Sequence, residues 1–87
     1  MHLSGLLVFC EPTSTEACVQ GLERCSDVDV YVTDSARGRV VVVLETETLE
    51  GQADGLRRVQ RVPHVKTAEL VYHYFGEAQD LDLGPNG

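Results

Sequence analysis

The stretch DVDVYVTDSARGRVVVVLE, residues 27–45, decides the fold. In its first part Val28, Val30 and Val32 alternate with polar or aromatic residues, which is the period of a strand buried on one side. A turn that ends in Gly38 follows, and the second part is a run of β-branched residues that favours extended chain. The pattern predicts a β-hairpin whose three alternating valines face the core.

Amphipathic helices are predicted on both sides of this hairpin. In TSTEACVQGLERC (13–25), Thr13 and Glu16 have the spacing of a capping box. The apolar residues that share one side of this helix are Cys18, Leu22 and Cys25. In ETLEGQADGLRRVQR (47–61), the corresponding residues are Leu49, Ala53, Leu56 and Val59.

Two further strands complete the pattern: LSGLLVFC (3–10), which is too short and apolar for a surface helix, and VKTAELVYHYF (65–75). The order βαββαβ predicts an α+β, ferredoxin-like sandwich, in which a four-stranded antiparallel sheet carries two helices on one face. Residues 1–75 are expected to form this single domain, and residues 76–87 a disordered acidic tail.

Composition limits the classes of function. A chain of 87 residues suits one small domain with one core. The net charge of −7, from 14 acidic and 7 basic residues, disfavours nucleic acid and anionic membranes as partners and favours a basic one. The sequence has neither a run of about 20 apolar residues nor the basic and apolar segments of a secretory signal, so we predict a cytoplasmic protein.

One face of the predicted sheet has no helix to cover it. If Leu70 and Tyr72 face the core, alternation turns His73 the other way, and the same reasoning applies to each strand. The candidate binding residues on this uncovered face and its acidic rim are Leu7, Phe9, Asp29, Tyr31, Val41, Val43, Glu45, Glu69, Val71 and His73. An exposed apolar patch of this kind indicates a subunit contact or a binding surface for an apolar peptide.

Catalytic and metal sites are not predicted. Cys10, Cys18 and Cys25 are an odd number of cysteines without a CxxC pair, so we expect reduced, buried thiols and no bound metal. A base at His73 would have only Glu69 and Tyr31 as nearby polar partners, which favours a strand-edge residue over a catalyst. The sequence also lacks a glycine-rich phosphate-binding loop after a strand.

The hairpin 27–45, the opening LSGLLVFC and the closing AELVYHYF together resemble the NapD family, which are cytoplasmic assembly chaperones for periplasmic nitrate reductase. The resemblance spans residues 3–74. Its most specific elements are Asp34, Gly38 before the valine run, and the Leu-Val-Tyr-His sequence that ends at His73. The turns before residues 28 and 66 depart from the family pattern.

The resemblance implies a protein that is not an enzyme, uses no cofactor, and binds the twin-arginine signal peptide of the nitrate reductase catalytic subunit as a monomer. Binding would delay export until the cofactors are loaded. Two alternatives share the architecture: an ACT-like effector-binding or dimerisation module, and a small cofactor-free monooxygenase whose subunits pair across their sheets. The size of the protein in solution discriminates, because both alternatives require a dimer.

Overall fold

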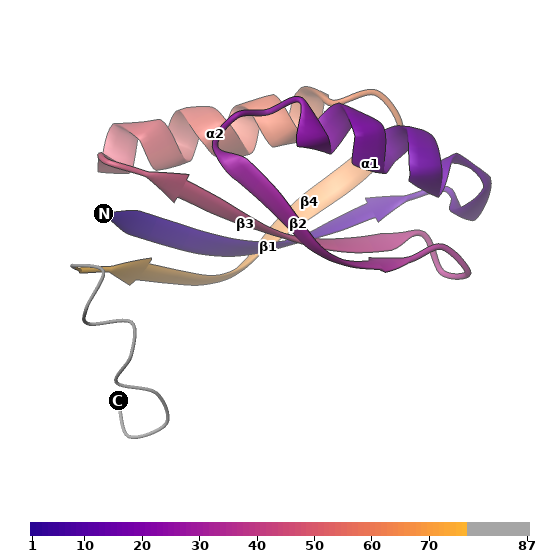
Figure 1. The fold of residues 1–87 in the computed structure, drawn as a ribbon, viewed down its shortest axis with the longest axis horizontal. Helices are drawn as coiled ribbons and strands as arrows, with labels where there is room; N and C mark the ends of the chain where they lie inside the picture. The colour runs from indigo at the N-terminus through magenta and orange to yellow at the C-terminus, as the bar shows by residue number, and fades with distance from the viewer. Residues whose placement is uncertain (77–87) are drawn as a thin grey trace, which may run out of the picture.

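The computed structural model describes residues 1–76. Its elements are β1 (His2–Cys10), the 3-10 turn η1 (Pro12–Ser14), α1 (Thr15–Glu23), β2 (Val28–Asp34), β3 (Arg39–Thr46), α2 (Leu49–Arg61) and β4 (Val65–Phe75). The predicted ferredoxin-like βαββαβ fold is confirmed (Figure 1). Of the predicted tail, 76–87, only Gly76 lies within the described residues. Neither helix within residues 1–76 is long and apolar enough to cross a membrane.

The four strands form one antiparallel sheet in the order β2-β3-β1-β4. Both helices lie on the same side of this sheet, and no segment of residues 1–76 covers the other side (Figure 1). The predicted hairpin joins β2 to β3 and turns at Gly38, whose φ of 71° lies in the left-handed region that glycine adopts without strain. Its N–H donates to the carbonyl of Asp34 over 2.9 Å, which closes the turn.

The core lies between the sheet and the helices. Its buried apolar side chains are Leu6, Val8, Cys10, Cys18, Leu22, Val28, Val40, Val42, Leu44, Val59, Val62 and Ala68. In β1 the buried residues Leu6, Val8 and Cys10 alternate with partly exposed ones, as predicted for a strand with one covered face. The predicted inward side of α1 is also confirmed for Cys18 and Leu22, which are fully buried.

The predicted capping box at Thr13 and Glu16 is wrong. The residue before α1 is Ser14, and its side chain makes no capping hydrogen bond. Pro12 instead begins a 3-10 turn, and the hydroxyl of Thr15 donates to the Pro12 carbonyl over 2.9 Å. Proline suits a first helical turn because its φ is already helical and its missing N–H is not needed there. The helix α1 therefore begins at Thr15, one residue later than an N-cap at Thr13 indicated.

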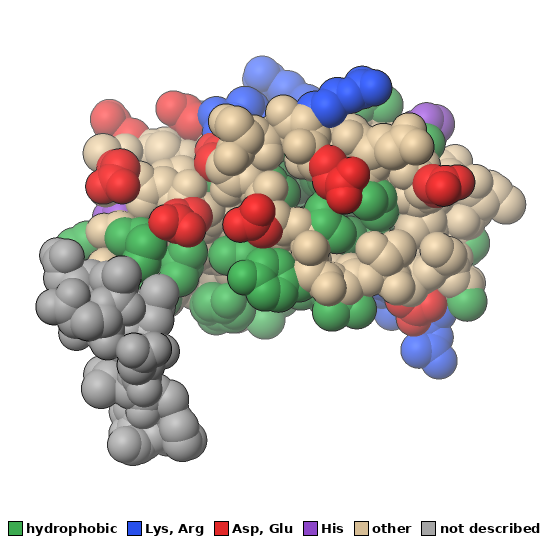
Figure 2. All heavy atoms as spheres, viewed as in Figure 1, with side chains coloured by type: hydrophobic (Ala, Val, Ile, Leu, Met, Phe, Trp, Pro, Cys, Tyr) green, Lys and Arg blue, Asp and Glu red, His purple; other side chains and the backbone are tan. Residues whose placement is uncertain are grey.

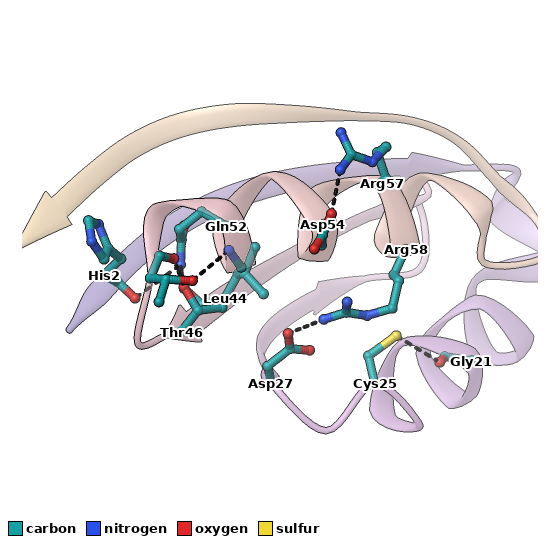
Figure 3. Close-up of polar contacts among 12 residues, drawn as sticks. His2, Gly21, Cys25, Asp27, Leu44, Thr46, Gln52, Asp54, Arg57 and Arg58 are labelled. Carbon is teal, nitrogen blue, oxygen red and sulfur yellow. Dashed lines mark hydrogen bonds and ion pairs between the residues drawn. The ribbon is translucent and has the colours of Figure 1, made fainter.

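The helix α2 is rotated relative to the prediction, so that Gln52 and Gly55 face the sheet where Leu49 was expected. Gln52 is only 7% exposed, and its amide nitrogen donates to the carbonyls of His2 (3.0 Å) and Leu44 (3.2 Å) (Figure 3). A β-carbon on Gly55 would come within 2.8 Å of Leu44 Cδ2, so the missing side chain lets the helix approach β3. Leu49 is left 63% exposed.

Both edge strands contain an irregularity that reverses the predicted alternation. In β2, Val30 pairs with Val42 and Val32 pairs with Val41, which leaves Tyr31 as an extra residue. An extra residue moves every following side chain to the other face. Val32 therefore points away from the helices and is 57% exposed, and the prediction that it faces the core is wrong.

The same effect occurs in β4. Leu6 pairs with Leu70 and Gly5 pairs with Tyr72, so Val71 is the extra residue. Tyr72 lies over Gly5 on the side away from the helices, where a β-carbon on the glycine would overlap the tyrosine ring. The prediction that Tyr72 faces the core is therefore wrong, whereas Leu70 stays on the helix side but is 56% exposed.

Candidate functional site

The side of the sheet away from the helices is called the open face here, and the strand register determines its members. Residues that pair directly across strands point to the same side, so each row of partners crosses one face. The rows on the open face are Glu45, Leu3 and Tyr74; Asp29, Val43, Gly5 and Tyr72; Val32, Val41, Leu7 and Glu69; and Asp34, Arg39, Phe9 and Thr67. Figure 2 shows apolar side chains along the lower side of the molecule, beneath the sheet.

Most of the predicted site residues share this face. Those that the register places there are Leu7, Phe9, Asp29, Val41, Val43, Glu45 and Glu69. Tyr31 and Val71 are the extra residues of the two edge strands, and both are well exposed, at 68% and 65%. They therefore lie at opposite borders of the sheet rather than in its centre.

The prediction that His73 lies on the uncovered face is wrong. His73 pairs with Ser4, and Ser4 faces α2, where its hydroxyl donates to the side-chain carbonyl of Gln52. The cause is the extra residue Val71, which moves the following residues to the other side of the sheet. His73 instead contacts His2, with 3.1 Å between Nε2 and Nδ1. Partial burial, then His73 and then the N-terminal amino group lower the pKa of the His2 ring.

Four apolar or aromatic side chains of the open face were not among the residues predicted from the sequence, and these are Leu3, Val32, Tyr72 and Tyr74. Three of them, Val32, Tyr72 and Tyr74, follow an extra residue in their strand, and simple alternation assigns such residues to the wrong face. Gly5 offered a signal for Tyr72, because glycine inside a strand commonly marks a close approach by another group. Here the group is an aromatic ring that covers the bare backbone.

The centre of the open face is packed, and its apolar side chains are more exposed on the two edge strands, at Val32 of β2 and Tyr72 of β4. Leu7, Phe9 and Val43 are half-buried by their neighbours, and Val41 is 37% exposed. Phe9 is covered on one side by the guanidinium of Arg39, which lies 4.8 Å from the ring centroid. Tyr72, at 50%, exposes more than any of them. The open face can therefore present a shallow apolar band across the strands.

Carboxylates border this band at the β2 and β3 end. Asp29 and Glu45 line a hollow of about 240 Å³ together with Asp27 and Glu47. One carboxylate oxygen of Asp27 accepts from Arg58, and the other is buried without a hydrogen-bond partner among the described residues (Figure 3). A hollow lined by several carboxylates attracts guanidinium and ammonium groups, which satisfy such oxygens directly.

A comparison with protein-family models identifies the chain. Residues 1–77 match the model described as NapD protein. The chain belongs to the NapD family. The family predicted from the hairpin and from the first and last strands of the sequence is therefore confirmed.

A solved structure supports the NapD assignment. The chain is similar to the solution structure of the Escherichia coli protein described as the Tat proofreading chaperone protein NapD. The two share 26% sequence identity with a TM-score of 0.77, over 87% of this chain and 80% of the other. No protein among those with curated functions matches the sequence.

Residues 1–76 contain no group of three or more His, Cys, Asp or Glu side chains placed to hold a metal ion. The three cysteines are free; the predicted burial is confirmed for Cys10 and Cys18, whereas Cys25 is only partly buried. Burial raises the pKa of the Cys18 thiol to about 12, with further contributions from Cys10, so this thiol stays protonated and unreactive.

Proposed function

We propose that this chain is a chaperone that binds the twin-arginine signal peptide of the catalytic subunit of periplasmic nitrate reductase. Binding delays export of the precursor until cofactor loading and maturation are complete. The observation that carries the proposal is an apolar open face bordered by carboxylates in a member of the NapD family. A twin-arginine signal has the matching composition, a basic segment followed by an apolar one.

The two parts of the peptide use different parts of the surface. The arginines lie at the hollow beside Asp29 and Glu45, where carboxylate oxygens accept guanidinium hydrogen bonds. The apolar segment follows the band of Leu7, Val41 and Val43. Contacts at the borders come from Phe9, Tyr31, Glu69 and Val71.

The proposal also sets where and in what form the protein acts. A signal peptide is available to a chaperone only before export, so the site of action is the cytoplasm. The open face is free for a peptide only when it is not closed by a second subunit, so the binding form is a monomer of one domain, residues 1–75. Neither nucleic acid nor a membrane is a partner, in line with the net charge of −7.

Calorimetry with synthetic peptides at two salt concentrations tests the proposal. A peptide with the twin arginines and the start of an apolar segment is expected to bind, and to bind more weakly at high salt. Replacing both arginines by glutamine is expected to reduce affinity about tenfold or more and to flatten the salt dependence. Replacing apolar residues by serine is expected to reduce affinity and leave the salt dependence unchanged.

A matched pair of protein variants locates the arginine site. The double variant D29N/E45Q removes two carboxylates at the hollow, and E16Q/E23Q removes two from the exposed side of α1. Both double variants change the net charge equally, so a difference between them reports the position of the carboxylates and not the total charge. Only D29N/E45Q is expected to lose the preference for the arginine peptide, because its carboxylates lie at the hollow. Equal binding of arginine and glutamine peptides to the unmodified protein would refute the electrostatic half of the proposal, and no binding of either would refute the function.

A further inference from the structure

The helix side of the molecule contains an apolar groove between α2 and the C-terminal half of β4. Its volume is about 270 Å³. It is lined by Leu44 on its floor, by Leu49, Ala53 and Leu56 on the α2 wall, and by Leu70 and His73 on the β4 wall. This volume is just below the range of about 300–1,000 Å³ typical of small-molecule pockets. The groove has room for an apolar side chain of a larger partner.

The groove exists because of two features of the chain already described. The burial of Gln52 and Gly55 turns α2 so that Leu49 and Ala53 face outward over β4. Leu70 points to the same side, yet it remains 56% exposed because no further element of residues 1–76 packs on it. Three apolar residues with the spacing of a core-facing side, Leu49, Ala53 and Leu56, thus line an open groove.

The apolar surface continues from this groove to the open face around the edge of the sheet. The extra residue Val71 separates Leu70, which lines the groove, from Tyr72, which lies on the open face. All three are at least half exposed. Within residues 1–76 no strand pairs with the outer edge of β4, so no other element covers these three side chains, and unpaired backbone groups of the edge lie beside them.

We propose that the groove is an anchor site for the apolar segment of the same peptide, a role that rests on the proposed function. The peptide begins at the carboxylate hollow near Asp29, crosses the open face along the row that ends at Tyr72, passes Val71, and inserts a large apolar side chain beside Leu70. The occupant must be apolar because Leu49, Ala53 and Leu70 form the walls. Its basic end matches the carboxylates at the start of the same row.

The geometry of the sheet limits the spacing within such a peptide. The row from Asp29 to Tyr72 crosses three inter-strand gaps, which is about 14 Å at roughly 4.8 Å each. A helical segment of about 10 residues spans this distance, as does an extended segment of about 4 or 5. Peptides whose apolar segment ends short of this length are expected to reach the open face but not the groove.

A filled groove tests the anchor. Ala53→Phe places a ring in the groove, and Ala17→Phe adds the same ring to the exposed side of α1 as a matched control. We expect Ala53→Phe to weaken calorimetric binding of the twin-arginine peptide about tenfold with an unchanged salt dependence, and Ala17→Phe to have no effect. Leu70→Asn changes the opposite wall and is expected to act like Ala53→Phe, which covers the case in which the larger residue disturbs folding.

The outcomes separate the anchor from the function itself. Normal binding by Ala53→Phe and Leu70→Asn, with loss in D29N/E45Q, would overturn the anchor and leave the proposed function standing. No binding by the unmodified protein would refute the proposed function. A nitroxide at the apolar end of the peptide is expected to broaden the methyl signals of Leu56 and Leu70, and broadening confined to Leu7 and Val41 would overturn the anchor. A dimer that Ala53→Phe abolishes would also overturn it, because a second copy would then be the occupant.

Discussion

The register of β4 can be tested by adding one carbon to Gly5. In Gly5→Ala the new β-carbon would overlap the ring of Tyr72, with Cδ2 at 2.7 Å, so the ring must swing away. Tyr72 is 50% exposed, so the movement uncovers about 100 Å² of a side chain whose total area is roughly 200 Å². At about 25 cal/mol per Å² this is at most about 2.5 kcal/mol. We expect a loss of about 1–2 kcal/mol, because alanine suits a strand better than glycine.

Urea unfolding of a double-mutant cycle measures this loss. In a Tyr72→Ala background there is no ring to displace, so Gly5→Ala is expected to be neutral or to stabilise by up to about 1 kcal/mol. The difference between the two backgrounds reports the contact between residues 5 and 72. If Gly5→Ala costs the same with and without the tyrosine ring, Tyr72 does not lie over Gly5, and the assignment of residues after Val71 to their faces is incorrect.

Two further predictions concern the core and the histidine pair. Leu44→Ala, at a side chain only 1% exposed, should lower the free energy of unfolding by about 2–5 kcal/mol. Leu70→Ala, at a side chain 56% exposed, should lower it by less than about 1 kcal/mol. Equal urea midpoints for the two variants would show that Leu70 is buried. An NMR titration should place the pKa of His2 below 6.5, chiefly because of partial burial, and His73→Asn should raise it part of the way. The folded state favours the neutral His2 ring, so the contribution of this ring to the free energy of unfolding is fully present above about pH 6.5 and is lost as the pH falls below it. A measured pKa of 6.5 or more would contradict the contact between His2 and His73.

The overall fold could be predicted because its signals are local and repeated. The alternation of Val28 and Val30 and the apolar spacing of Cys18 and Leu22 each depend on a single local periodicity, and both agree with the structure, whereas the alternation fails at Val32. What failed was the assignment of faces beyond Tyr31 and Val71. An extra residue in a strand leaves no mark in composition, because it depends on how two strands meet rather than on either one.

The candidate site shows the same division. Leu7, Val41 and Val43 were placed correctly because regular pairing joins β1 to β3 without interruption. His73 was placed on the wrong face, and the groove was not anticipated, because both depend on tertiary contacts. The rotation of α2 in particular follows from a buried glutamine, which a hydrophobic pattern assigns to solvent.

The buried side chain of Gln52 determines whether the groove is already formed before a partner binds. Its amide meets the hydroxyls of Ser4 and Thr46 and the carbonyls of His2 and Leu44, and this set of partners is available at only one rotation of the helix. A leucine at this position would pack acceptably at several rotations, since apolar contact is not directional. The hydrogen bonds of Gln52 thus fix the rotation of α2, and with it the separation of the two groove walls, before any peptide binds. The groove is therefore preorganised, and a side chain that binds in it loses no binding free energy to a rearrangement of its walls.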